Sequence, residues 1–74
     1  MLRPGSTIGI LGGGQLGRMT AIAAARLGYR THIFANEPDS PAAQVSAAVT
    51  VASFSDPAAV ARFADSVDVA TCEF

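Results

Sequence analysis

The sequence lacks several of the residues that build specialised sites. Cys72 is its only cysteine and it contains no lysine, so a disulfide framework and a multi-cysteine metal site are excluded and a reducing compartment, the cytoplasm, is expected. Its five basic residues are arginines scattered along a chain of net charge −1, whereas a nucleic-acid surface needs a clustered basic patch. We therefore expect no nucleic-acid partner and no metal site in this segment.

Long hydrophobic runs are also absent. A membrane-spanning helix needs about 20 consecutive apolar residues, and no stretch of this sequence approaches that length. Residues 1–6 lack the long apolar core of a signal peptide. We therefore expect no contact with a membrane.

The length of 74 residues allows one domain at most, and a chain this short buries only about 60% of its unfolded surface. Apolar residues make up 50% of the sequence, which argues against disorder. Residues 68–74 have the pattern of a strand, and the sequence stops inside it without a turn. We expect residues 1–74 to be an incomplete N-terminal domain with poor stability on its own; a small protein that ends in a strand is the alternative.

The pattern of apolar runs and turn residues predicts the order β-α-β-β-α-β. Strands are expected at 7–11, 30–35, 48–52 and 68–74, helices at 15–27 and 57–66, and one helical turn at 42–46 after the proline-containing loop 36–41. Strands that alternate with helices of this length are typical of parallel βαβ units with right-handed crossovers. The fold class is therefore α/β, a Rossmann-like parallel sheet with flanking helices, truncated after the fourth strand.

Each helix has an apolar stripe that should cover the sheet. In the first helix, which Gly28 ends, the stripe consists of Leu16, Met19, Ala23 and Leu27. In the second helix, which begins with Asp56 as N-cap and Pro57 in the first turn, it consists of Val60, Phe63, Ala64 and Val67.

Three consecutive glycines, Gly12 to Gly14, separate the first strand from the first helix. With Gly17 they give the spacing Gly-x-Gly-x-x-Gly, which lets a backbone approach a phosphate at the positive end of a helix. A tight turn without a ligand is the alternative, but three glycines in a row carry a high entropic cost for a turn alone. We therefore predict a phosphate-binding corner at residues 12–17.

Parallel sheets bind ligands outside the carboxyl ends of their strands. If the fourth strand lies beside the first, the phosphate corner adjoins residues 72–74 and the carboxylate of Glu73. An NAD site would instead need an acid about 20 residues after the glycines to hold a ribose. Glu37 lies at that distance, although in a loop beside Pro38. The motif and its spacing therefore do not decide between NAD and another phosphate ligand.

The segment GILGGGQLGRM (9–19) resembles the signature of the 5-(carboxyamino)imidazole ribonucleotide synthase family, ATP-grasp ligases of purine biosynthesis. Residues 39–45 and 68–74 resemble two further segments of that family in order and spacing. The resemblance implies a Rossmann-like pre-ATP-grasp domain in an enzyme that converts aminoimidazole ribonucleotide, bicarbonate and ATP to 5-carboxyaminoimidazole ribonucleotide, ADP and phosphate. It also implies a homodimer, with ATP and Mg²⁺ bound by later domains.

The resemblance also assigns residues. The backbone of Gly14, Gln15 and Leu16 would hold the 5′-phosphate, and the Glu73 carboxylate would accept hydrogen bonds from the amine that becomes carboxylated. The other residues of the corner that could contribute are Gly12, Gly13, Gly17 and Arg18. For Arg18 a solvent-exposed or interface role is the alternative, and for Glu73 it is an acid that points into solvent.

The remaining polar residues have ordinary structural interpretations. Asp39 and Ser40 could contact a ribose, although loop capping is the commoner role. His32 has no visible partner for metal or base chemistry and is interpreted as structural. Cys72 replaces an aromatic or aliphatic residue of the family pattern, which suggests a packing substitution and a buried thiol.

Three rival functions remain. Formate-dependent phosphoribosylglycinamide formyltransferase, a related ATP-grasp enzyme, typically has an acid and a lysine where this chain has Gln15 and Arg18. An NAD-binding Rossmann domain of an oxidoreductase would use Glu37 to bind a ribose. A non-catalytic nucleotide sensor would bind its ligand without turnover. We expect the 74-residue segment alone to be inactive, because it has no ATP-grasp domain and no evident magnesium ligands.

Overall fold

The structure, a computed structural model, describes residues 2–72 and has the element order expected from the sequence. The elements are β1 (Thr7–Leu11), α1 (Gln15–Arg26), β2 (Arg30–Ala35), the 3₁₀ turn η1 (Ala43–Val45), β3 (Ala48–Val51), α2 (Pro57–Asp65) and β4 (Val69–Cys72). Local signals explain the helix boundaries. The Asp56 side chain accepts a hydrogen bond from the Ala59 amide at 3.2 Å, and Gly28 follows α1 with a φ of 87°.

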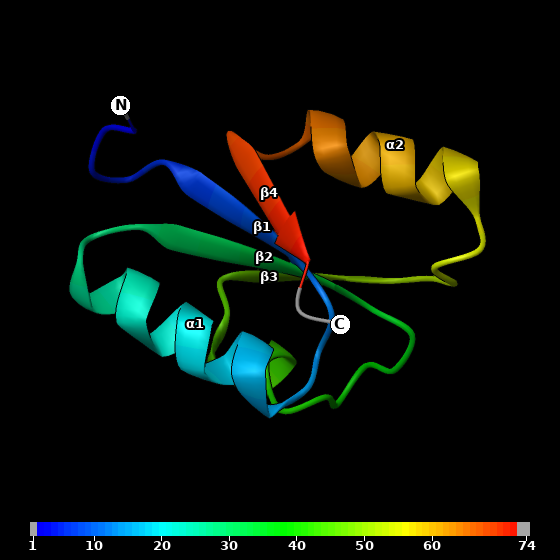
Figure 1. The fold of residues 1–74 in the computed structure, drawn as a ribbon, viewed down its shortest axis with the longest axis horizontal. Helices are drawn as coiled ribbons and strands as arrows, with labels where there is room; N and C mark the ends of the chain where they lie inside the picture. Colours follow the sequence, from blue (N-terminus) through cyan, green and yellow to red (C-terminus); the bar gives the residue numbers. More distant parts are fainter. Residues whose placement is uncertain (1, 73–74) are drawn as a thin grey trace.

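The four strands form one parallel sheet in the order β3-β2-β1-β4. Ile10 of β1 pairs with Ile33 of β2 on one side and with Thr71 of β4 on the other. Helix α1 covers one face of the sheet and α2 covers the other (Figure 1). This is the Rossmann-like α/β arrangement that the sequence predicts.

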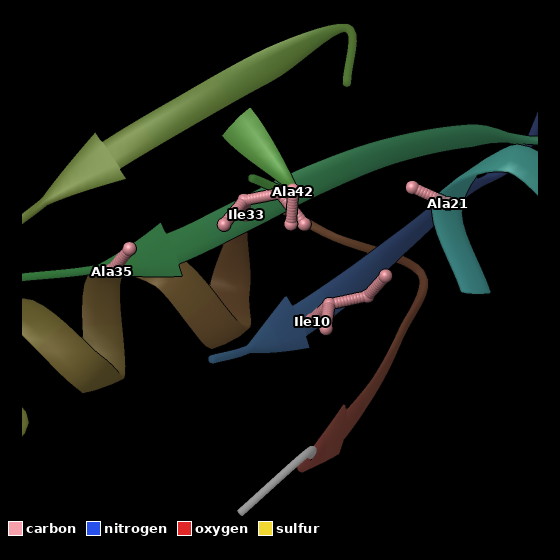
Figure 2. Close-up of a cluster of buried hydrophobic side chains, with 5 residues drawn as sticks. All are labelled: Ile10, Ala21, Ile33, Ala35 and Ala42. Carbon is pink, nitrogen blue, oxygen red and sulfur yellow. The ribbon is translucent and has the colours of Figure 1, made fainter. Parts of the chain in front are cut away.

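The core on the α1 face is built mostly from small side chains. Its buried members are Ile10, Ala21, Ile33, Ala35 and Ala42, which come from β1, α1, β2 and the segment before η1 (Figure 2). Because successive strand residues point to opposite faces, Ile33 and Ala35 face α1 while Phe34 between them faces α2.

On the α2 face, aromatic rings fill the space between helix and sheet. Phe34 and Phe63 are fully or almost fully buried, with ring centroids 5.3 Å apart and an interplanar angle of 68°. Ala59 is the third buried member, and Val60 and Val67 pack against the cluster. The expected stripe of α2 is therefore correct at three positions and wrong at Ala64, which is exposed.

The predicted face of α1 is wrong. Its large apolar side chains are exposed, with Leu16, Met19 and Leu27 at 62%, 64% and 71%, and the residues that face the sheet are Gly17, Ala21 and Ala24. The reason is close approach: a Cβ at Gly17 would lie 2.9 Å from the Gly12 carbonyl oxygen. Only small residues fit against a sheet at that distance.

The expected buried thiol is also wrong. Cys72 is exposed, because β4 is an edge strand whose four residues are all exposed. The thiol therefore has no packing role within residues 2–72.

Candidate functional site

The glycine corner begins where β1 ends. Gly12 follows Leu11 with a φ of 127°, a conformation that favours glycine because a side chain there would be strained. Its amide donates to the Phe34 carbonyl oxygen at 2.9 Å, so β2 holds the turn in place. The chain then leaves the sheet at its carboxyl edge, where ligands bind in parallel sheets.

Helix α1 starts with backbone amides that have no acceptor among residues 2–72. Gly14 is its N-cap and makes no side-chain cap hydrogen bond, and the first intrahelical hydrogen bond runs from the Arg18 amide to the Gly14 carbonyl at 3.0 Å. The amides of Gln15, Leu16 and Gly17 precede the first residue that has an intrahelical acceptor. Because the first turn contains no acidic side chain, its dipole is free to attract an external anion.

The glycines of the corner differ in what surrounds them. A Cβ at Gly13 would lie 2.5 Å from Ser40 Oγ, and a Cβ at Gly17 would meet the Gly12 carbonyl, whereas a Cβ at Gly14 would have no atom within 4 Å. Packing therefore explains glycine at 13 and 17. At Gly14 the backbone faces open space, as a site of anion approach requires.

The segment after β2 returns to the amino end of α1 (Figure 1) and is fixed there. The Ala42 amide donates to the Gly13 carbonyl at 3.0 Å. Ser40 lies against Gly13 with only 7% of its surface exposed, and Ser40 Oγ has no hydrogen-bond partner within the described part of the chain. Between the two segments is a cavity of about 220 Å³, lined by Gly13, Gly14, Ala35, Asn36, Glu37, Ser40 and Pro41.

Arg18, half-buried in the first turn of α1, points to the segment around η1. Its Nη1 donates to Gln44 Oε1 at 3.4 Å, and Gln44 Nε2 donates to the Asp39 carbonyl at 3.3 Å. This chain of hydrogen bonds ties loop 36–41 to the helix, and the alternative of a solvent-exposed or interface role for Arg18 stays open. The guanidinium remains a positive charge one turn from the corner.

The carboxyl ends of β1 and β4 lie side by side, as expected if the fourth strand neighbours the first. Leu11, the residue before the glycines, pairs with Cys72. Glu73, the predicted contact to the amine, lies outside the described residues. The structure thus places the glycine corner at the edge of the sheet where β4 also ends.

His32 lies on the opposite face, remote from the glycine corner. Its Nε2 is 2.7 Å from Thr50 Oγ1, its Nδ1 is 3.4 Å from Ser66 Oγ, and its ring contacts Phe63 edge-on at 4.9 Å. Burial lowers the pKa of His32 below its ordinary value of 6.5, because desolvation disfavours the charged form. The structural interpretation of His32 fits these contacts. The cavity of about 270 Å³ beside it belongs to this face as well.

Among residues 2–72, no group of three histidine, cysteine or acidic side chains gathers as a metal site would require. None of the helices in this region has the length and apolarity to cross a membrane.

The sequence does not predict that the segment after β2 packs against the glycine corner. For Ser40 it favours loop capping over a ribose contact, whereas the structure buries the Ser40 hydroxyl beside Gly13 and places Glu37 in the lining of the adjoining cavity. The available signal was the similarity of residues 39–45 to a family segment, which marked that loop as more than a connection.

Comparisons with known proteins agree with this geometry. The profile of the ribonucleotide synthetase preATP-grasp domain matches residues 5–74. The N5-carboxyaminoimidazole ribonucleotide synthase of Brucella melitensis is 58% identical over 73 residues, which cover 99% of this chain and 20% of that protein. The corresponding protein of Bacillus subtilis is 39% identical over 74 residues, again 20% of its length.

Solved structures of synthases with this name are also similar to the chain in sequence and in fold. The ADP complex of an N5-carboxyaminoimidazole ribonucleotide synthetase superposes with a TM-score of 0.96 at 47% identity, over 100% of this chain and 20% of the other. The Aspergillus clavatus synthase in complex with ADP and 5-aminoimidazole ribonucleotide has a TM-score of 0.85 at 38% identity, over 96% of this chain and 19% of the other.

This chain spans about a fifth of the length of these relatives. Within that fifth, the profile match extends from the first strand through the glycine corner to the last residue. The chain therefore belongs to the ribonucleotide synthetase preATP-grasp domain family.

Proposed function

We propose that residues 1–74 are the amino-terminal, substrate-binding part of a 5-(carboxyamino)imidazole ribonucleotide synthase. The enzyme would convert aminoimidazole ribonucleotide, bicarbonate and ATP to 5-carboxyaminoimidazole ribonucleotide, ADP and phosphate. The observation that carries the proposal is the glycine corner with uncapped amides at the start of α1. It is supported by the 58% identity to the Brucella melitensis synthase.

In this proposal the corner binds the 5′-phosphate of the ribonucleotide. The backbone amides of Gly14, Gln15 and Leu16 would donate to its oxygens, and the positive end of α1 would stabilise its charge. The Gln15 side chain would lie near the same phosphate and add a donor. Arg18, already bonded to Gln44, would contribute its charge without a direct contact.

Glu73 would act on the other end of the substrate. Its carboxylate would accept hydrogen bonds from the amine, hold it in position and take up its proton. The amine nitrogen forms a bond to the carbon of a carboxyphosphate, and phosphate leaves with the electrons of the broken C–O bond. ATP would supply the phosphoryl group that activates bicarbonate, and Mg²⁺ held by other parts of the full-length enzyme would neutralise the phosphate charges.

We further propose a homodimer in the cytoplasm, in keeping with the family resemblance and with a sequence that has one cysteine and no disulfide framework. Light scattering of the full-length protein tests the dimer. A monomer at all concentrations would refute it.

The test of function is ADP release by the full-length protein in bicarbonate buffer. Release that requires aminoimidazole ribonucleotide is the expected result, and Glu73→Gln should then lower kcat. Release with glycinamide ribonucleotide and formate would move the assignment to the formyltransferase. Absence of ATP turnover with every substrate would refute the ligase and favour a dinucleotide-binding or sensor role.

A further inference from the structure

A second cavity lies on the α2 face of the sheet, remote from the glycine corner. Helix α2 connects β3 to β4, which are the two edge strands of the sheet, and it packs on Phe34 of β2. Beside α2, towards β3, is a cavity of about 270 Å³ that the proposed reaction does not use. The polar members of its lining are His32, Thr50, Arg62 and Ser66.

The hydrogen bonds around His32 determine which ring nitrogen carries its proton. Ser66 Oγ donates its only proton to the Phe63 carbonyl oxygen at 2.7 Å, so it can only accept from His32 Nδ1, which is 3.4 Å away. Because a neutral imidazole carries one proton, Nε2 is the acceptor and the Thr50 hydroxyl donates to it at 2.7 Å. In this neutral state, which burial favours by lowering the pKa of His32, neither the ring nor the two hydroxyls have a proton left for a ligand.

Protonation of His32 changes what this network offers. Nε2 then carries a proton and donates to Thr50 Oγ1, so the hydroxyl proton of Thr50 must turn to another acceptor. His32 and Thr50 both line the cavity. One added proton therefore gives the same wall of the cavity a positive charge and a hydroxyl donor, and both favour an anion over a cation.

Arg62 supplies a permanent positive charge to the cavity. It lines the cavity from α2, and its side chain has no ion pair or hydrogen bond within residues 2–72. Among the described residues of the lining there is no acid, and Arg62 and His32 are the members that can carry charge. The guanidinium matches the oxygens of a carboxylate or phosphate group. The cavity is smaller than the roughly 300 Å³ at which pockets for larger ligands begin, so a small anion fits it best.

We propose that this cavity is a binding site for a small oxyanion, a carboxylate or a tetrahedral phosphate-like group, which binds together with a proton on His32. The anion lies against the Arg62 guanidinium and accepts from the Thr50 hydroxyl, while the charged imidazole donates from Nε2 to Thr50 and from Nδ1 to Ser66. Because proton and anion stabilise each other, the affinity falls by up to about tenfold per pH unit above the pKa of His32 in the free protein. The site does not depend on the glycine corner or on the proposed reaction.

The first experiment follows the imidazole resonance of His32 in the full-length protein by NMR during pH titrations with and without sulfate. Sulfate is a tetrahedral anion that keeps its charge over the range in which histidine titrates, and sodium chloride keeps the ionic strength constant. The spectrum of His32→Gln identifies the resonance. Sulfate should raise the pKa of His32 by about 1, as expected for a nearby opposite charge. An identical pKa with and without sulfate would overturn the site.

Two arginine variants separate the cavity from other places where sulfate could bind. Arg62→Gln removes the permanent charge of the cavity and should abolish the effect of sulfate on the pKa of His32. Arg26→Gln is the matched control, because it removes the same charge from the exposed last turn of α1, on the other face of the sheet, and it should leave the effect unchanged. An effect that persists in Arg62→Gln would place the sulfate elsewhere and overturn the site.

Substitutions of Thr50 test the hydroxyl donor. Thr50→Val removes the hydroxyl and should raise the Kd for sulfate several-fold below the pKa of His32, whereas Thr50→Ser keeps the hydroxyl and should retain the wild-type Kd. A purely structural Thr50 would change the Tm alone. An unchanged Kd in Thr50→Val, whatever its Tm, would overturn the role of Thr50 as a donor to the anion.

Acetate in place of sulfate identifies the class of anion. A larger rise in the pKa of His32 with acetate supports the site and assigns it to a carboxylate, and a larger rise with sulfate supports it and assigns it to a phosphate-like group. Every arm reads His32 and none reads ADP release. Failure of this site and failure of the proposed synthase function are therefore distinguishable.

Discussion

Substitution of Gly13 by alanine should destabilise the protein through a steric clash with the segment after β2. The added Cβ would lie 2.5 Å from Ser40 Oγ, 2.6 Å from Ser40 Cβ and 3.0 Å from Ala35 Cβ. Carbon atoms in contact are normally about 3.5–4.0 Å apart, so the overlap with Ser40 is about 1 Å. Ser40 has little room to withdraw, because the neighbouring Ala42 amide is bonded to the Gly13 carbonyl. We expect a loss of about 1–3 kcal/mol.

Two further variants test the steric reason. Gly14→Ala places its Cβ in open space at a φ of −77°, where a poorer N-cap and a less flexible unfolded chain have opposite effects of about 0.5 kcal/mol each. Its stability should therefore match the wild type. Ser40→Gly removes both close atoms, so the double variant with Gly13→Ala should lose at least about 1 kcal/mol less than the sum of the single variants.

The assay is urea unfolding of the ligand-free full-length protein, followed by circular dichroism at constant pH and salt. The double-mutant cycle compares the urea midpoints of the wild type, Gly13→Ala, Ser40→Gly and the double variant. Gly14→Ala serves as the control. Wild-type stability of Gly13→Ala, or strictly additive effects in the double variant, would refute the packing of Gly13 against Ser40.

Three other changes test other parts of the structure. Ala21→Leu, at a fully buried position of α1, should cost about 1–3 kcal/mol, whereas Ala25→Leu on the exposed side should be neutral; equal urea midpoints would contradict the observed helix face. Asp56→Ala removes the N-cap of α2 and should cost about 1 kcal/mol; an unchanged Tm would rule out the cap. Because the pKa of His32 is lowered in the folded state, the unfolded state binds more protons below pH 6.5. The free energy of unfolding should therefore be unaffected by His32 above pH 6.5 and should decrease as the pH falls from there towards the folded-state pKa. His32→Gln should flatten that slope in urea midpoints, and an identical slope in the variant would assign it to other groups.

The order of the elements follows from local chemistry. Helix and strand ends are set by backbone conformations and hydrogen bonds within a few residues. Glycines follow β1 and α1, and α2 begins at Asp56 and Pro57. Such signals need no tertiary structure. For this reason the boundaries in the structure differ from those predicted from the sequence by at most one residue over residues 2–72.

The side of α1 that faces the sheet could not be predicted from local signals. Hydrophobicity alone favours Leu16 and Met19 as the residues that cover the sheet. The structure instead turns Gly17 and Ala21 inward, because β1 continues directly through the glycine corner into the helix and brings it close to the sheet. At that distance side-chain volume decides the orientation, and the available volume depends on the opposing strands rather than on the helix sequence.

The parts of the candidate site also differ in how far the sequence predicts them. The predicted phosphate-binding corner lies in contiguous residues 12–17, so one strand, one turn and one helix start are enough to predict it. The cavity beside it joins Gly13 to Glu37 and Ser40, which are more than 20 residues away in the sequence. They meet because β2 pairs with β1 in register, Leu11 opposite Phe34, and the Ala42 amide then binds the Gly13 carbonyl. The glycine motif therefore predicts an anion site from local sequence, whereas the cavity beside it follows from the pairing of β1 with β2 and cannot be predicted from either segment alone.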